Sequence, residues 1–168
     1  MRVAVTGTPG TGKTTATDLV ESDLDVIHLN EVIKSEDLSL REDAERDTLV
    51  ADMDAVEEWL GDRDGVIVDS HLAHHLPVDK VVVLRCQPEE LEGRLTERGE
   101  SEAKAEENAE SEALDIVLSE AVENHGLEAV YEIDATDRSP EAVAREIERV
   151  LADEREPSAG EVSFIDYL

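Results

Sequence analysis

Residues 7–14 read GTPGTGKT and fit the pattern G-x-x-x-x-G-K-[ST]. In such a loop the glycines let the backbone curl, so that successive N–H groups and the start of the following helix face a phosphate group. Lys13 can then reach the β- and γ-phosphates of a nucleotide, Thr14 offers a hydroxyl to Mg²⁺, and Thr15 is placed to donate to the α-phosphate. The motif predicts a loop that binds ATP, or a close relative of it, together with Mg²⁺.

An acidic residue at the tip of a neighbouring strand would complete this site, because it can hold the metal ion through water. Asp69 ends the apolar run VIVD and is predicted to fill this role. His71 lies two residues further on and could orient an attacking water or touch the γ-phosphate. The alternative for His71 is a loop histidine that only packs.

Three other side chains of reactive type are expected to carry no chemistry. His74 and His75 are adjacent, but no other ligand has a suitable spacing, and a Zn²⁺ site needs three or four ligands. We therefore predict ordinary loop residues at both positions. Cys86 is the single cysteine, so it cannot form an intramolecular disulfide, and its place beside an apolar strand predicts a buried side chain.

A sheet is needed to position these residues, and five short runs rich in Val, Ile and Leu are predicted to form its strands. The runs are Val3 to Thr6, Val26 to Leu29, Val66 to Asp69, Lys80 to Arg85 and Ala129 to Ile133. Sequences such as VIVD and VVVLR are apolar on both faces, as is typical of parallel strands covered by helices on each side. Their alternation with helical patterns predicts an α/β domain with three layers and a five-stranded parallel sheet.

Helices are predicted to begin near Pro88 and Pro140, because proline suits the first helical turn, where its missing N–H leaves no partner unpaired. Two amphipathic helices are predicted to pack on the sheet. Their apolar positions are Leu114, Val117, Leu118, Ala121 and Val122 in one, and Val143, Ile147, Val150 and Leu151 in the other. The segment from about 155 to 168 ends in apolar and aromatic residues, so it is predicted to dock on the domain.

The charge balance is extreme, with 15 Lys and Arg against 44 Asp and Glu and a net charge of −29. A chain of 168 residues suits one domain, here residues 1–168. Repulsion among so many carboxylates opposes compaction in dilute salt, and at 1 M ionic strength its range falls to about 3 Å. We therefore expect a salt-adapted protein. Disorder is the competing interpretation of high net charge, and the regular apolar runs argue against it.

Composition also limits the partners. No apolar run approaches the roughly 20 residues that a membrane-spanning helix needs, and the N-terminus lacks the regions of a signal peptide. We therefore expect a cytoplasmic protein without membrane contact. Binding to phosphate backbones depends on clustered cations, so the acidic charge argues against direct nucleic acid binding and suits a basic protein partner.

The sequences GTPGTGKTT, VIVDSH and VVLRCQPEELEGRLTERG, taken together, resemble the adenylate kinase isoenzyme 6 family, also called the coilin-interacting nuclear ATPase protein family. The resemblance runs from residue 2 to about 150, and the chain looks like an archaeal, salt-adapted member. It implies a P-loop fold of the nucleoside monophosphate kinase type, phosphoryl exchange between ATP and AMP or related nucleotides, and an ATPase activity. It also implies a part in maturation of the small ribosomal subunit through transient binding of a ribosomal protein of the uS11 type.

The resemblance further implies roles for individual residues. It assigns the ATP phosphates to Gly10, Gly12, Lys13, Thr14 and Thr15. Arg98 would be the first residue of a short lid that runs to about Asn108. Residues of about 30 to 53 would form the arm that holds the monophosphate.

In that arm Lys34, or less securely Arg41 or Arg46, could contact the phosphate, with ordinary helix ion pairs as the alternative for the two arginines. Arg138 would lie near adenine. Glu100 departs from the family, which often has an aromatic residue there, so the substrate range stays open.

Two functions remain open at this point. One is a nucleoside monophosphate kinase in which Lys13 and Mg²⁺ neutralise the transferred phosphoryl group and Arg98 closes over it. The other is an ATPase switch that acts on a ribosomal protein partner, with incidental kinase activity and His71 at the hydrolytic water. The same residues serve both, and acceleration of ATP consumption by AMP would distinguish them.

Overall fold

The computed structural model describes residues 1–43 and 48–168, and it is built on a central sheet of five parallel strands. In chain order the strands are β1 (Arg2–Thr6), β2 (Asp25–His28), β5 (Val66–Asp69), β6 (Lys80–Arg85) and β7 (Val130–Asp134). Their order across the sheet is β2-β5-β1-β6-β7, and each neighbouring pair is parallel. The five predicted strands are thus confirmed to within a residue at their ends.

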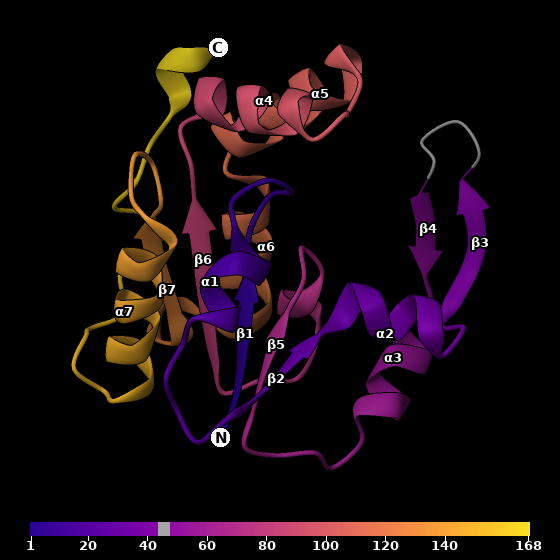
Figure 1. The fold of residues 1–168 in the computed structure, drawn as a ribbon. Coiled ribbons are helices and arrows are strands. Elements are labelled where there is room, and N and C mark those ends of the chain that lie inside the picture. Colours follow the sequence, from indigo (N-terminus) through magenta and orange to yellow (C-terminus); the bar gives the residue numbers. More distant parts are fainter. Residues whose placement is uncertain (44–47) are drawn as a thin grey trace.

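Helices cover both faces of the sheet, as Figure 1 shows. The seven α-helices that the described residues form are α1 (Lys13–Asp18), α2 (Leu29–Ser35), α3 (Met53–Leu60), α4 (Pro88–Glu97), α5 (Glu102–Ala113), α6 (Ile116–His125) and α7 (Pro140–Leu151). Helices α4 and α7 begin at Pro88 and Pro140, as predicted. Short 3₁₀ helices lie at η1 (Ala73–His75), η2 (Leu127–Ala129) and η3 (Ile165–Tyr167).

The core has two sides because side chains alternate along each strand. Val3 and Val5 of β1 point to the face that α1 and α7 cover, whereas Ala4 points to the face covered by α2, α3 and α6. Helix α7 contributes Val143, Ile147 and Val150 to its side of the core, each at most 3% exposed. The predicted three-layer α/β fold is confirmed.

Helices α4 and α5 form a pair above the carboxyl ends of the strands (Figure 1). Leu91, Leu95 and Ala105 join Cys86 in a small core of their own, and each is fully buried. The expected burial of Cys86 is confirmed, and burial raises the pKa of its thiol to about 12.

One predicted helical position is wrong. Leu114 is 52% exposed and caps the end of α5, so it does not belong to the buried face of α6. Asp115 follows it with φ of 57°, a left-handed conformation that ends one helix and starts the next in a new direction. Spacing alone cannot reveal this break. Val117, Leu118 and Ala121 of α6 are buried as predicted.

A second, smaller sheet stands apart from the central one. Strands β3 (Ser39–Asp43) and β4 (Thr48–Ala51) pair in antiparallel fashion and are flanked by α2 and α3. In Figure 1 this group stands to the right of the central sheet, apart from the α4–α5 pair at the top. Most of the predicted arm, residues 30–53, lies in these elements, and Arg46 lies outside the described residues.

The C-terminal segment docks, as predicted. The backbone N–H of Ser158 donates to Val130 O (3.0 Å), and that of Glu161 donates to Glu132 Oε1 (2.9 Å). Tyr167 donates its hydroxyl to Glu92 Oε2 of α4 (3.0 Å), which attaches η3 to the α4–α5 pair. Within the described residues, no helix has the length and apolar character needed to cross a membrane.

Candidate active site

The loop between β1 and α1 has the backbone conformation that its glycines predict. Gly10 has φ of 94° and Gly12 has φ of 91°, values that other residues rarely adopt. A Cβ atom at Gly10 would lie 2.9 Å from Leu91 Cδ1 and 3.0 Å from Leu95 Cδ2. The loop is therefore closely packed under α4 and has no room for a side chain at this position.

Lys13 begins α1 and lies almost fully buried inside the loop. Its ammonium donates to Gly7 O (2.9 Å) and Thr8 O (3.2 Å), so the cation is held in the concave side of the turn. Burial lowers the pKa of Lys13 to about 8, against the attraction of Asp69. Thr14 and Thr15 follow on the first turn of α1, and both are exposed.

Asp69 is the centre of a group of polar side chains at the carboxyl ends of three strands. It is 4% exposed, and it accepts from Thr14 Oγ1 at 3.3 Å and from Thr17 Oγ1 at 2.9 Å. His28, at the end of β2, contacts the same carboxylate through Nδ1 and contacts Asp18 through Nε2 (2.7 Å). Burial alone would lower the pKa of His28, but its hydrogen bonds to Asp69 and Asp18 outweigh burial and raise it.

Sequence reasoning placed Asp69 beside Thr14 and missed the other partners. Thr17 lies one helical turn after Thr14, so the two share a face of α1. His28 ends a strand whose register with β5 sets it directly opposite Asp69. For His28 the signal was present, since polar residues at the ends of neighbouring parallel strands meet at one edge of the sheet.

His71 lies just beyond Asp69, half-buried in the turn that leads to η1. Burial, and then the charge of Lys13, lower the pKa of His71 to about 4. The imidazole is therefore neutral at pH 7 and can accept a proton or a hydrogen bond.

Two arginines of α4 approach the loop from above. Arg94 places its guanidinium 3.4 Å from Gly10 O and also contacts Glu90 (3.3 Å). Arg98 ends α4, is 58% exposed and lies 3.7 Å from Glu100, while its charge still lowers the pKa of Lys13. Arg98 was predicted at the site and Arg94 was not, although both belong to the same short sequence.

Of the remaining predicted residues, Arg138 and Lys34 are exposed and belong to elements other than the loop. Arg138 is exposed in the turn between β7 and α7, where its neighbour Asp137 donates a backbone N–H to Glu90 of α4 (3.4 Å). Lys34 is exposed in the last turn of α2. Arg41 lies in β3, and its side chain is outside the described residues.

A buried carboxylate connects α5 to the loop. Glu112 is 2% exposed and accepts from Thr8 Oγ1 (3.0 Å), from Cys86 N (2.8 Å) and from Arg85 Nε (3.3 Å). Burial raises the pKa of Glu112, although Arg85 and these hydrogen bonds oppose the rise. Arg85 is itself buried and also pairs with Glu132 (2.8 Å). No short sequence pattern indicates this network, because Glu112 lies far along the chain from Thr8, Arg85 and Cys86.

Comparisons with known proteins agree with this geometry. The family described as AAA domain matches residues 3–115. A protein of Natronomonas pharaonis named "Putative adenylate kinase" is 62% identical over 168 residues, with 100% of both chains covered. Proteins of the same name from Halobacterium salinarum (59% over 169 residues, 100% of both chains) and Methanosarcina acetivorans (43% over 163 residues, 90% of this chain and 86% of the relative) are also similar.

Among solved structures, a shikimate kinase from Bacteroides thetaiotaomicron aligns with a TM-score of 0.60 at 16% identity, covering 90% of this chain and 98% of the kinase. At this identity the likeness shows the fold, that of P-loop kinases. The chain belongs to the AAA domain family of P-loop proteins and, together with its archaeal relatives, to the family whose members are named "Putative adenylate kinase".

Proposed function

We propose that the chain is a nucleoside monophosphate kinase that transfers the γ-phosphate of ATP to AMP or a related monophosphate. The observation that carries the proposal is the placement of Lys13 and Asp69 at one edge of the sheet, with an arginine-bearing helix above them and a separate α/β arm beside them. Such a reaction needs two nucleotides held in line, so a phosphate loop flanked by two appendages suits it. The relatives' name, putative adenylate kinase, supports the same reaction class.

Each proposed role rests on chemistry of the side chain concerned. The loop N–H groups around Gly10 and Gly12 would hold the phosphates, and Lys13 would exchange its bonds to backbone carbonyls for the β- and γ-phosphate oxygens. Thr15 would donate to the α-phosphate. Arg98 is exposed at the end of α4, and its ion pair with Glu100 is as long as 3.7 Å, so it can turn its guanidinium toward phosphate oxygens.

Two further residues would contact the nucleotides from outside the loop. Lys34 would contact the monophosphate from α2, and Arg138 would lie beside adenine, between α4 and β7. Residues 98–108 run from the C-cap of α4 through the first half of α5, and they would form the lid over ATP.

The residues present fit Mg²⁺. This ion prefers oxygen ligands, and the Thr14 hydroxyl lies 3.3 Å from Asp69 Oδ1. When bound, the ion would neutralise charge that develops on the β- and γ-phosphates. The chain's own contribution is to fix the Asp69 carboxylate. Thr17 and His28 contact its Oδ2 atom, whereas Oδ1 lies toward the Thr14 hydroxyl.

A coupled assay in molar KCl tests the proposal. ATP consumption is measured alone and with AMP, CMP, GMP or UMP. We expect at least one monophosphate to accelerate ATP consumption strongly, with diphosphates formed in equal amounts from donor and acceptor. A rate that no monophosphate changes would contradict the kinase assignment.

A second candidate is an ATPase switch that serves small-subunit maturation by binding a basic ribosomal protein of the uS11 type. The position and neutral state of His71 favour it, because a neutral imidazole beside the γ-phosphate can orient a water. The net charge of −29 suits a basic partner. If His71 serves hydrolysis, His71→Ala lowers ATPase turnover more than transfer to AMP. Equal losses would remove the water-orienting role.

A further inference from the structure

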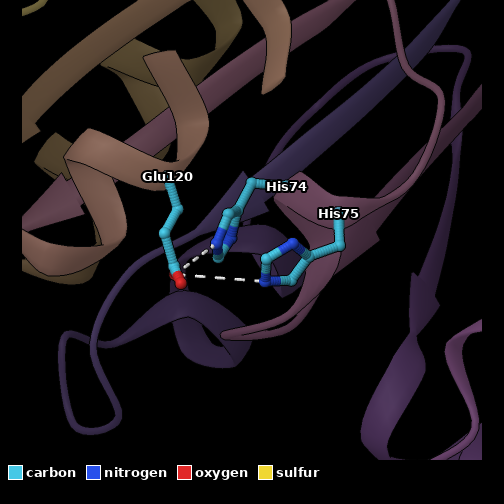
Figure 2. Close-up of side chains that lie close together, drawn as sticks. All are labelled: His74, His75 and Glu120. Carbon is cyan, nitrogen blue, oxygen red and sulfur yellow. Dashed lines mark hydrogen bonds and ion pairs between the residues drawn. The ribbon is translucent and has the colours of Figure 1, made fainter. Parts of the chain in front are cut away.

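His74 and His75 of η1 meet a carboxylate that lies far along the chain. Glu120 of α6 points at both imidazoles, as Figure 2 shows. One ligand atom from each residue can be chosen so that all three lie within 4.8 Å of one another. Two histidines next to each other were expected to be ordinary loop residues because no third ligand had suitable spacing. The fold supplies that ligand from a helix 45 residues after His75.

The distances suit a shared metal ion. Glu120 Oε1 lies 3.0 Å from His74 Nε2 and 3.9 Å from His75 Nε2. Zn²⁺ binds histidine nitrogen and carboxylate oxygen at about 2.0–2.2 Å, so two ligand atoms of a tetrahedral ion lie about 3.4 Å apart. The distance from Glu120 to His74 is already that short, and the distance to His75 would shorten by about 0.5 Å. The largest separation in the group, up to 4.8 Å, would close by about 1.4 Å through rotation of the partly exposed His75 and Glu120 side chains.

The surroundings of His74 favour a ligand role. Its side chain is 1% exposed, and its second ring nitrogen, Nδ1, lies 2.7 Å from the buried hydroxyl of Thr6. Histidines that bind metal through Nε2 usually donate a hydrogen bond from Nδ1–H to an oxygen atom, which fixes the ring. The Thr6 hydroxyl oxygen can accept that hydrogen bond. The backbone carbonyl of His74 also accepts from His125 Nε2 (2.7 Å), so η1 is fastened to α6.

The other two residues leave a way in for an ion. The side chain of His75 is 34% exposed and that of Glu120 is 42% exposed, so solvent reaches the space between them. The fourth position of a tetrahedral ion would face that opening and hold water. One contact would be given up. Asn124 Nδ2 lies 3.3 Å from His75 Nδ1, which would carry a proton once Nε2 binds an ion.

We propose that His74, His75 and Glu120 bind one divalent transition-metal ion, with Zn²⁺ the ion best suited to two imidazoles and one carboxylate. This site is separate from the one at Asp69, and it does not depend on the proposed kinase activity. The ion would tie η1, which follows the Asp69 and His71 turn, to α6. It would therefore stabilise the folded chain, because it binds only where both elements are in place.

The test is a calorimetric titration of the full chain with ZnCl₂, in KCl and excess Mg²⁺ so that oxygen-ligand sites are occupied. We expect one Zn²⁺ per chain, and a fall in affinity of at least about tenfold in both His75→Ala and Glu120→Gln. The control is Glu123→Gln, an exposed carboxylate of the same helix outside the group, which should bind as the wild type does. Both ligand positions are accessible enough for their variants to fold.

A second measurement reads coordination directly. Co²⁺ in place of Zn²⁺ should give intense visible absorption typical of four-coordinate geometry in the wild type and in Glu123→Gln. Zn²⁺ should raise Tm in the same two proteins and not in His75→Ala or Glu120→Gln. Unchanged Zn²⁺ affinity in those two variants, or no stoichiometric binding in the wild type, would overturn the proposal.

Discussion

Replacement of Glu112 tests how strongly α5 is tied to the phosphate loop. In Glu112→Ala three donors lose their acceptor, namely the Thr8 hydroxyl, the Cys86 N–H and Arg85 Nε. All three residues are at most 1% exposed, so water cannot easily replace the carboxylate. An unsatisfied buried group costs about 1–3 kcal/mol, so we expect a loss of at least about 3 kcal/mol in the free energy of unfolding.

The amide variant separates hydrogen bonding from charge. Glu112→Gln keeps one acceptor oxygen for Cys86 N–H, and the Thr8 hydroxyl can rotate to accept from the new amide. Arg85 keeps Glu132 at 2.8 Å. Burial raises the pKa of Glu112, so Arg85 and the hydrogen bonds only partly offset the cost of burying its negative charge. We therefore expect Glu112→Gln to cost only about 1 kcal/mol.

Urea unfolding in about 2 M KCl measures both variants, with Glu110→Ala, an exposed residue of the same helix, as the control. For a chain of this size, 3 kcal/mol corresponds to a fall in Tm of about 6–12 °C. A loss below about 1 kcal/mol in Glu112→Ala, or equal losses in the Ala and Gln variants, would show that the hydrogen bonds of Glu112 do not hold α5 to the loop. Equal losses would mean that ion pairing, rather than hydrogen bonding, dominates at this position.

Four further predictions follow from the same structure. Lys13→Ala abolishes transfer and hydrolysis while the circular dichroism spectrum is kept, because in the proposed mechanism the buried ammonium is the main protein charge that neutralises the phosphates. Gly10→Ala lowers Tm and raises the KM for ATP, since φ of 94° and the Leu91 contact leave no room for a Cβ atom, whereas Gly93→Ala, with no atom within 4 Å, raises Tm slightly. The raised pKa of Glu112 contributes stability that is present at acid pH and is lost as pH rises through the folded pKa. As the pH falls from 7 to about 4.5, the free energy of urea unfolding should therefore rise in the wild type relative to Glu112→Gln. Tm rises continuously from about 0.1 M to about 2 M KCl, because salt screens the repulsion behind the net charge of −29.

Specific results would contradict these predictions. Wild-type turnover in a folded Lys13→Ala protein would remove the loop from the chemistry. An unchanged KM and Tm in Gly10→Ala would show that the loop accommodates a Cβ atom without loss of stability or of ATP binding. A pH-independent difference between wild type and Glu112→Gln would mean that the Glu112 pKa is not raised. A flat or falling Tm with added KCl would assign the acidic surface to another purpose, such as the binding of a basic partner.

The sequence predicted the parts of the site that are local in the chain. The loop and Asp69 follow from short patterns, since a glycine-rich turn after a strand, and a carboxylate at a strand tip, each carry their own geometry. His28 could also have been found, because its strand ends at the same edge of the sheet as Asp69.

Contacts between distant residues could not be predicted in this way. Glu112 meets Thr8 across 104 positions, and Glu120 meets His74 across 46. Neither pair belongs to a recurring pattern, so only the packing of α5 and α6 against the sheet reveals it. The prediction for Leu114 was wrong for a related reason. The left-handed residue after it changes the direction of the chain, and hydrophobic periodicity carries no information about a single backbone angle.

If the loop and Asp69 serve transfer between two nucleotides, as we propose, the γ-phosphate of ATP must pass to the monophosphate. The full chain is incubated in molar KCl with Mg²⁺, AMP and ATP labelled at the γ-phosphate, and the products are separated. We expect the label mainly in ADP, and we expect no labelled ADP from Lys13→Ala. Label recovered only as inorganic phosphate, at the same rate with and without AMP, would rule out transfer to AMP.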